Sequence, residues 1–292
     1  MTVRANALMG IENHTLTKPA DLYMDLLVKC LTRYGFDRGF SLRVLPPRNP
    51  VKKMLWDVEQ HVLKRRGLRV HRQTPFDPAK RSEGRDWPEN AETMIGLTRL
   101  QNLRECATAV IEDGIPGDFI ETGVWRGGAC ILMRGLLAAH GVTDRTVWVA
   151  DSFQGLPVPS GKYEADAGDV HHTYDVLAVS RSDVEENFQR YSLLDEQVRF
   201  LEGWFSETLP TAPIDQLAIL RLDGDMYEST IDALTALYPK LSPGGYAIID
   251  DYGNKMTAGC RAAVTDFRGA NGISDEIHAV DWTGAYWRKS AS

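Results

Sequence analysis

Strand-like and helix-like segments alternate over about 200 residues of this chain, and this alternation limits the possible folds more than any other feature. A helical pattern at residues 92–112 is followed by short apolar runs typical of buried strands, with amphipathic stretches between them. The expected strands are 118–122, 146–150, 197–201, 217–222, 246–249 and 277–280. The expected helices between them are 129–140, 182–191, 229–241 and 257–269. The pattern predicts an α/β fold with a doubly wound parallel sheet.

The chain before residue 91 has a different character. Residues 22–34 and 51–66 have the apolar spacing of amphipathic helices, whereas residues 74–90 are polar and rich in proline. We therefore expect two parts, a helical N-terminal appendage over residues 1–90 and an α/β domain over residues 91–292.

Composition excludes several classes of protein. The apolar content of 43% and the charged content of 25% are ordinary for a globular protein. No apolar run approaches the ~20 residues that span a bilayer, and residues 1–15 have no apolar core of signal-peptide type. The four cysteines are scattered and form no CxxC pair. We expect a cytoplasmic protein with no membrane partner.

Charge is distributed unevenly along the chain. Residues 36–86 carry thirteen Lys or Arg and six Asp or Glu, a net +7, so the remainder carries −14 because the whole chain carries −7. An acidic remainder argues against a nucleic-acid partner, which requires a basic surface. The basic segment 36–86 is interpreted as a solvated helical face, or as a surface for an acidic substrate or an acidic face of a partner subunit.

Four aspartates follow two of the expected strands. Asp223 and Asp225 come after strand 217–222, and Asp250 and Asp251 come after strand 246–249. The carboxyl ends of parallel strands meet at one edge of a doubly wound sheet, where ligands bind. Carboxylates gathered there repel one another, and a divalent cation relieves the repulsion. Alternatively, Asp225 caps the helix that follows it and the Asp250-Asp251 pair opens a surface turn.

Two further acidic residues indicate a cofactor. Residues 120–128 read IETGVWRGG, in which glycines permit close approach to a ligand but do not form G-x-G-x-x-G. Glu121 in this turn can pair with an amino-acid ammonium, and Asp151 after the second strand suits a ribose diol. A nucleoside that carries an amino acid is S-adenosylmethionine. The alternative for each acid is a cap on backbone amides.

Six segments between about residues 86 and 289 resemble the macrocin O-methyltransferase family in order and spacing. They are Thr93-Met94-Ile95-Gly96-Leu97, Glu121-Thr122-Gly123-Val124-Trp125-Arg126-Gly127-Gly128, Ala150-Asp151-Ser152-Phe153-Gln154-Gly155-Leu156-Pro157, Gly203-Trp204-Phe205, Leu222-Asp223-Gly224-Asp225-Met226-Tyr227 and Asp250-Asp251-Tyr252. The resemblance implies a Rossmann-like sheet and a homo-oligomeric enzyme that depends on S-adenosylmethionine and Mg²⁺. Enzymes of this family tailor antibiotics by methylating deoxysugars of macrolides and, in one branch, aminocoumarins.

The resemblance also implies residue roles. Asp223, Asp250 and Asp251 ligate Mg²⁺, and Asp225 is the general base. The residues implied to line the cofactor site are Thr93, Met94, Glu121, Thr122, Gly123, Val124, Trp125, Asp151, Ser152, Phe153, Gln154 and Gly155, with Gly203 and Trp204 beside the adenine end. Residues 36–80 depart from the family because the chain is longer there, and this leaves the acceptor open.

We expect this enzyme to methylate a hydroxyl of a deoxysugar on a small-molecule, glycosylated natural product. One alternative keeps the reaction and changes the acceptor to a phenolic or aminocoumarin-type ring. A nicotinamide-dependent oxidoreductase on the same fold lacks its G-x-G-x-x-G motif here. A non-catalytic cofactor-binding protein would not require the four aspartates. Residues 161–175, which include His171 and His172, are interpreted as a lid over the acceptor or as a solvated loop.

Overall fold

The computed structural model describes residues 18–34, 36, 39–43, 49–67, 71–86, 88 and 90–291. The expectation about residues 1–15 lies outside this range. Within the described residues, no helix has the length and apolar character that a membrane crossing requires.

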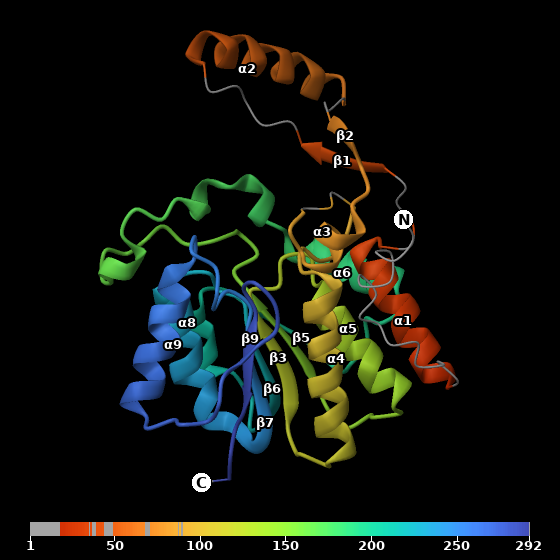
Figure 1. The fold of residues 1–292 in the computed structure, drawn as a ribbon, viewed down its shortest axis with the longest axis vertical. Helices are drawn as coiled ribbons and strands as arrows, with labels where there is room; N and C mark the ends of the chain where they lie inside the picture. The colour runs from red at the N-terminus through yellow and green to blue at the C-terminus, as the bar shows by residue number, and fades with distance from the viewer. Residues whose placement is uncertain are drawn as a thin grey trace, which may run out of the picture.

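A seven-stranded sheet forms the centre of the molecule, with the order β5-β4-β3-β6-β7-β9-β8 (Figure 1). Its strands are β3 (Asp118–Thr122), β4 (Val147–Asp151), β5 (Val198–Glu202), β6 (Leu217–Leu222), β7 (Leu241–Ile249), β8 (His278–Ala279) and β9 (Ala285–Arg288). Strands β3 to β7 are parallel, whereas β9 is antiparallel to both of its neighbours. The chain runs outward from β3 to β5 and then returns to β6, so the topological switch point lies between β3 and β6. The predicted Rossmann-like α/β fold is confirmed.

Helices cover both faces of the sheet because successive strand residues point to opposite sides. Phe119 of β3 belongs to the core shared with α1 (Pro19–Thr32), α4 (Leu97–Glu112), α5 (Gly128–Ala139) and α6 (Arg181–Arg190). The next residue, Ile120, belongs to the core shared with α8 (Tyr227–Leu237) and α9 (Ala258–Ala270). Figure 1 shows these two layers on opposite sides of the strands.

Several element boundaries differ from the expected ones. The helix expected from residue 92 begins at Leu97, because Gly96 is extended and the carbonyl of Glu92 instead accepts the N–H of Gly128 at 3.0 Å. The helix expected at 229–241 spans Tyr227–Leu237, and β7 begins at Leu241. The short helix α7 (Phe205–Thr208) and strand β9, which lies between β7 and the edge strand β8, were not expected.

The segment before residue 91 contains unlike parts. Helix α1 packs on α4 and α5, and its Met24, Leu27 and Leu31 are buried in the core beside them. Strands β1 (Gly39–Arg43) and β2 (His71–Pro75) form an antiparallel pair, with α2 (Pro50–Arg65) between them in sequence. Helix α3 (Pro78–Ser82) begins after Asp77, whose side chain accepts two backbone N–H groups.

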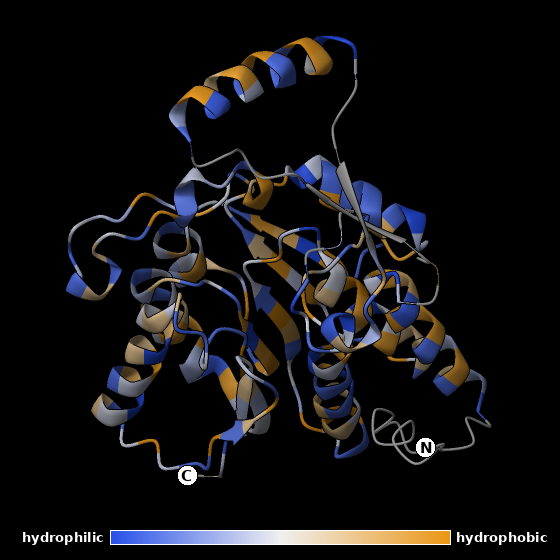
Figure 2. Ribbon diagram, turned by 45° about the horizontal axis from the view of Figure 1, so that its top comes forward, coloured by the Kyte–Doolittle hydropathy of each residue, from blue (hydrophilic) through white to orange (hydrophobic). Residues whose placement is uncertain are grey.

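Helix α2 stands away from the sheet and its covering helices in both views (Figures 1 and 2). One apolar stripe of this helix is exposed, with fractional exposures of 47% to 64%. The stripe consists of Val51, Met54, Leu55, Val58 and Val62.

Candidate active site

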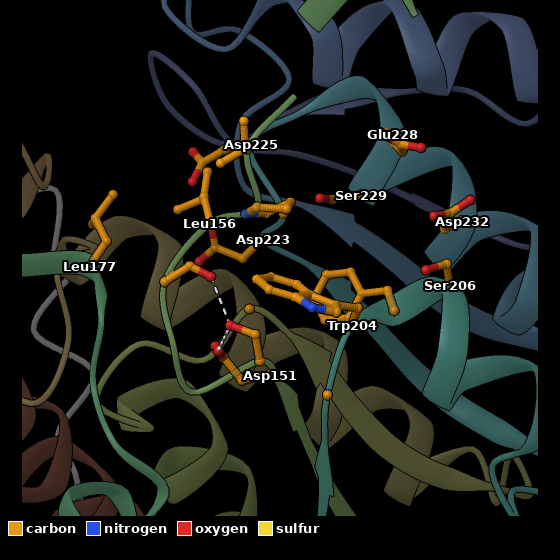
Figure 3. Close-up of a pocket in the computed structure, with 18 of the residues that line it drawn as sticks. Asp151, Leu156, Leu177, Trp204, Ser206, Asp223, Asp225, Glu228, Ser229 and Asp232 are labelled. Atoms are coloured by element: carbon orange, nitrogen blue, oxygen red, sulfur yellow. Dashed lines mark hydrogen bonds between the residues drawn. The ribbon is translucent and has the colours of Figure 1, made fainter. Parts of the chain in front are cut away.

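A cavity opens at the carboxyl ends of the parallel strands, at the switch point between β3 and β6. Figure 3 shows Asp223 and Asp225 at one end of the cavity, Asp232 and Ser206 at the other, and Trp204 between them. The predicted site residues that line it are Met94, Gly123, Trp125, Asp151, Ser152, Gly155, Gly203, Trp204, Asp223 and Asp225. One cavity therefore joins the predicted cofactor turn to two of the four aspartates.

The other predicted site residues do not line this cavity. They are Thr93, Glu121, Thr122, Val124, Phe153, Gln154, Asp250 and Asp251. All of them are buried except Gln154, which is exposed. Thr93 packs against the first residue of α5, since a Cβ on Gly128 would lie 2.7 Å from the Cβ of Thr93.

Asp151, the last residue of β4, is held rigidly beside the cavity. Its Oδ2 accepts the backbone N–H of Val124 at 2.7 Å, and its Oδ1 accepts the backbone N–H of Phe153 at 2.7 Å. Burial raises the pKa of Asp151, and these hydrogen bonds oppose the rise. The Ser152 hydroxyl, 3.5 Å from Oδ1, and the backbone N–H of Trp125 also donate to this carboxylate. Four protein groups therefore already donate to its two oxygens, and a ligand hydroxyl would replace the long contact from Ser152.

Glu121 is engaged inside the protein. It is 2% exposed; its Oε1 pairs with Arg221 and its Oε2 accepts from the Cys130 thiol at 2.9 Å. Burial raises the pKa of Glu121 to about 7, although Arg221 acts in the opposite direction. The structure therefore gives Glu121 a definite role as a counter-charge to Arg221, in addition to its predicted contact with an ammonium group.

Three aspartates converge at the ends of β6 and β7. Asp223, Asp250 and Asp251 each offer one carboxylate oxygen, and these three atoms lie within 4.8 Å of one another. The Oδ2 atom of Asp251 is buried and has no hydrogen-bond partner. A buried carboxylate oxygen without a partner is costly, and convergent oxygens are the ligands that hard divalent cations prefer. The residues present therefore fit a metal site.

Two buried arginines partly neutralise this acidic cluster. Arg221 of β6 pairs with Glu121, Asp223 and Asp250, and Arg99 of α4 pairs with Asp250 and with Asp281. Six carboxylates gather here, those of Glu121, Asp223, Asp225, Asp250, Asp251 and Asp281, against two guanidinium groups. The remaining negative charge is what a divalent cation would balance.

Asp225 occupies the turn between β6 and α8 in a left-handed backbone conformation, with φ of 56°. Its carboxyl group shares a hydrogen bond with that of Asp251. Burial and the charge of Asp223 raise the pKa of Asp225 to about 7, while His171 acts to lower it. Burial and the neighbouring Asp225 likewise raise the pKa of Asp251. A carboxylate with a near-neutral pKa is suited to accept a proton.

Sequence reasoning missed both arginines of the acidic cluster. Arg221 carried a signal, because it interrupts the apolar run 217–222 and a charge inside a buried strand requires partners. Arg99 lies in a helical pattern in which a charged residue is ordinary, so nothing in the sequence marked its role. Two further cavity residues, Leu156 and Phe205, lie in segments that resemble the family but were given no role. Others were missed because they come from loops and helix starts without a motif: Leu177, Ser206, Glu228, Ser229 and Asp232.

The fold and the site together describe a Rossmann-like α/β protein with an acidic cluster beside its switch-point cavity. A family model described as macrocin-O-methyltransferase (TylF) matches residues 20–289. The chain belongs to the macrocin O-methyltransferase family and is an O-methyltransferase. The resemblance seen in the sequence is confirmed.

Individual relatives agree with this placement. Demethyldecarbamoylnovobiocin O-methyltransferase of Streptomyces niveus is 58% identical over 75% of this chain and 84% of its own. The 8-demethyl-8-(2,3-dimethoxy-alpha-L-rhamnosyl)-tetracenomycin-C 4'-O-methyltransferase of Streptomyces olivaceus is 48% identical over 93% of this chain and 94% of its own. The solved structure of the O-methyltransferase NovP superposes with a TM-score of 0.78 at 48% identity, covering 93% of this chain and 100% of NovP.

Proposed function

We propose that this enzyme transfers a methyl group from S-adenosylmethionine to a hydroxyl of a deoxysugar on a glycosylated natural product, with Mg²⁺ bound at the acidic cluster. One observation carries the proposal: the cavity that Asp151 and Trp204 line ends at Asp223 and Asp225. A donor held at one end and an acceptor hydroxyl held at the other would meet in one cavity, and such alignment provides much of the acceleration of a transfer.

Asp223, Asp250 and Asp251 would hold the Mg²⁺. Both oxygens of Asp250 already accept from arginines, but each keeps a lone pair, and the unpartnered Oδ2 of Asp251 is free to ligate. When bound, the cation favours ionisation of an acceptor hydroxyl. Asp225, beside Asp251, accepts the proton that the hydroxyl loses, and its raised pKa suits this role.

The turns after β3 and β4 would bind the donor. Gly123 brings the backbone close to the cavity because its φ of 84° is accessible to glycine. Asp151 would accept the ribose hydroxyl protons, and Glu121 would contribute negative charge near the amino-acid end. Gly203 and Trp204 after β5 would flank the adenine.

The acceptor is proposed from the relatives. The tetracenomycin relative is named for a substrate with a dimethoxy-rhamnosyl group, which favours a deoxysugar hydroxyl as the acceptor. A phenolic or aminocoumarin-type acceptor is the alternative, since another relative is named for a novobiocin derivative. Phenols ionise more readily than sugar hydroxyls, so a strict requirement for Asp225 favours the sugar.

Two experiments test this proposal. Calorimetry of the purified enzyme with S-adenosylhomocysteine should show binding, and titration with NAD should show none; the reverse result would favour an oxidoreductase. A mass-spectrometric screen against glycosylated natural products and their aglycones should show one added methyl group only on glycosylated acceptors. Methylation of an aglycone phenol alone would replace the sugar with a ring as the acceptor.

The remaining proposals concern the whole chain. We propose that residues 1–90 form an appendage that helps to close over the acceptor, that residues 91–292 form the methyltransferase domain, and that the enzyme is a cytoplasmic homo-oligomer. The four cysteines are free, which supports a reducing compartment. The exposed stripe of α2 supports self-association, because apolar surface of this kind is stabilised when a partner covers it.

A further inference from the structure

The segment between β4 and α6, residues 156–179, lies over the cavity. Leu156, Pro157, Val158, Ser160 and Leu177 of this segment line it. Figure 1 shows the segment in green beyond the ends of α8 and α9. The contacts that hold segment 156–179 against the rest of the protein determine whether the cavity is closed.

Asp166 attaches this segment to α8 by two hydrogen bonds, beside single bonds from Ser160 to Glu228 and from Trp125 to the carbonyl of Val176. Asp166 is 5% exposed, and its two carboxylate oxygens accept two successive backbone N–H groups of α8. Oδ1 accepts from Tyr227 at 2.7 Å and Oδ2 accepts from Glu228 at 2.9 Å. The N-cap residue of α8, Met226, provides no side-chain cap of its own. A carboxylate distant in sequence therefore caps this helix and meets the positive end of its dipole.

The surroundings are shaped to admit this carboxylate. Gly259 of α9 faces it, and a Cβ at that position would lie 2.9 Å from both the Oδ1 of Asp166 and the backbone nitrogen of Tyr227. The ring of Tyr163 also packs on the ring of Tyr227, with centroids 4.6 Å apart. Helices α8 and α9 and the covering segment therefore meet at Asp166.

The capped helix begins at Tyr227, two residues after Asp225. Asp225 has a left-handed backbone, which is uncommon for residues other than glycine although aspartate adopts it more readily than most. Because Tyr227 follows two residues later, the bonds to Asp166 fix the direction in which the chain leaves Asp225.

We propose that Asp166 is a positioning residue: it latches segment 156–179 over the cavity and, through the first turn of α8, holds Asp225 in place for proton transfer. This inference rests on the proposed function, in which Asp225 is the base. Asp166 itself acts through the backbone of α8 and not on the substrate.

Hydrogen exchange tests the latch without any acceptor. First-turn amides of a helix have no helical partner and ordinarily exchange fast. In the wild-type enzyme, the amides of Tyr227 and Glu228 should exchange at least tenfold more slowly than in Asp166→Ala, and segment 156–179 should also lose protection in the variant. Equal exchange in the two proteins would overturn the latch.

Kinetics test the positioning role. At a temperature where all variants are folded, kcat should fall at least tenfold in Asp166→Ala and less in Asp166→Asn, which keeps one acceptor oxygen. Ser180→Ala is the matched control: it removes the side-chain cap of α6, where Ser180 accepts the N–H of Asp183 at 3.2 Å, and should leave kcat within twofold of wild type. Wild-type kcat in Asp166→Ala, or an equal loss in Ser180→Ala, would overturn the role.

Gly259→Ala disturbs the Asp166 contact from α9. It provides a second test if Asp166→Ala does not fold. Its added Cβ displaces the carboxylate, so it should lower kcat and speed exchange at Tyr227; a variant with wild-type kcat and exchange would contradict the proposal. Failure of the proposed function is distinguishable from failure of the latch. A wild-type enzyme that showed no methyl transfer would still show slow exchange at the amides of Tyr227 and Glu228. Methyl transfer undiminished in Asp166→Ala would remove the positioning role and leave the function intact.

Discussion

Asp225 combines three properties that a proton acceptor needs. It lines the cavity, it lies beside Asp251, whose Oδ2 has no hydrogen-bond partner, and burial raises its pKa to about 7. Asp223, two residues earlier, instead pairs with Arg221. The structure thus gives the two aspartates of one turn different partners, Arg221 for Asp223 and Asp251 for Asp225.

Replacing Asp225 with asparagine should abolish turnover and preserve donor binding. The amide keeps the shape of the side chain but cannot accept the proton, and loss of a general base costs roughly 10²–10⁴-fold in rate. Mass spectrometry of the methylated product measures turnover, and calorimetry with S-adenosylhomocysteine measures binding. Turnover near the wild-type rate would remove Asp225 as the base.

Arg221 is the residue on which the charge balance of the site depends. It is 1% exposed and pairs with three carboxylates, so its removal would leave several buried negative charges without a partner. The net value of a buried ion pair is small, but breaking one by removing a single partner is expensive.

Arg221→Met should lower the free energy of unfolding by about 3–5 kcal/mol. Urea denaturation of the metal-free protein measures this change. Arg199→Met on β5 is the control, since Arg199 is exposed and its replacement should change the free energy of unfolding by less than about 0.5 kcal/mol. A similar small change in Arg221→Met would show that the three carboxylates do not depend on it.

At the scale of elements, the turns after β3 and β6 are packed against each other. The N–H of Asp223 donates to the carbonyl of Thr122 at 2.9 Å, and a Cβ on Gly123 would lie 1.8 Å from the carbonyl oxygen of Asp223. The turn after β3 and the turn after β6 are therefore coupled by direct backbone contact.

Gly123→Ala should disrupt both turns at once. The added Cβ collides with backbone and the φ of 84° disfavours it, so affinity for S-adenosylhomocysteine should fall about tenfold or more, a loss of at least ~1.4 kcal/mol. Gly141→Ala is the control, because its φ is 66° but its Cβ would meet nothing within 4 Å. Calorimetry measures the affinity of both variants for S-adenosylhomocysteine. Equal affinities in Gly123→Ala and Gly141→Ala would contradict the coupling of the two turns.

The elements that could be predicted from the sequence are those with a continuous apolar run. Strand β6 appears as predicted at Leu217–Leu222, because burial on both faces of a parallel strand requires such a run. Strand β9 escaped prediction because it is a short antiparallel strand near the sheet edge. The cap that Asp166 supplies to α8 joins residues 61 positions apart, and no local pattern reports such a contact.

At the scale of the whole molecule, α2 and the body differ in charge and in exposure. Residues 36–86, which include α2, carry a net +7 and the remainder −14, and the apolar stripe of α2 is exposed. Opposite charges between the two parts would draw the α2 of one copy toward the body of another, and burial of the stripe would stabilise the contact.

The double variant Leu55→Asp, Val58→Asp should therefore be monomeric at concentrations where the wild type is an oligomer. Sedimentation velocity measures the mass of each. Gln60→Asp introduces a charge at a polar position of the same helix and should leave the oligomer unchanged. An oligomer that persists in the double variant would place the interface elsewhere.

The central claim is that the acidic cluster binds the cation on which methyl transfer depends. The most direct measurement is the rate of methyl transfer by the purified enzyme in excess EDTA and after Mg²⁺ is restored, with Asp251→Asn beside the wild type. The rate of the wild type should vanish with EDTA and return with Mg²⁺, whereas that of Asp251→Asn should not return, because its unpartnered carboxylate oxygen is lost. An undiminished wild-type rate in excess EDTA would contradict the claim.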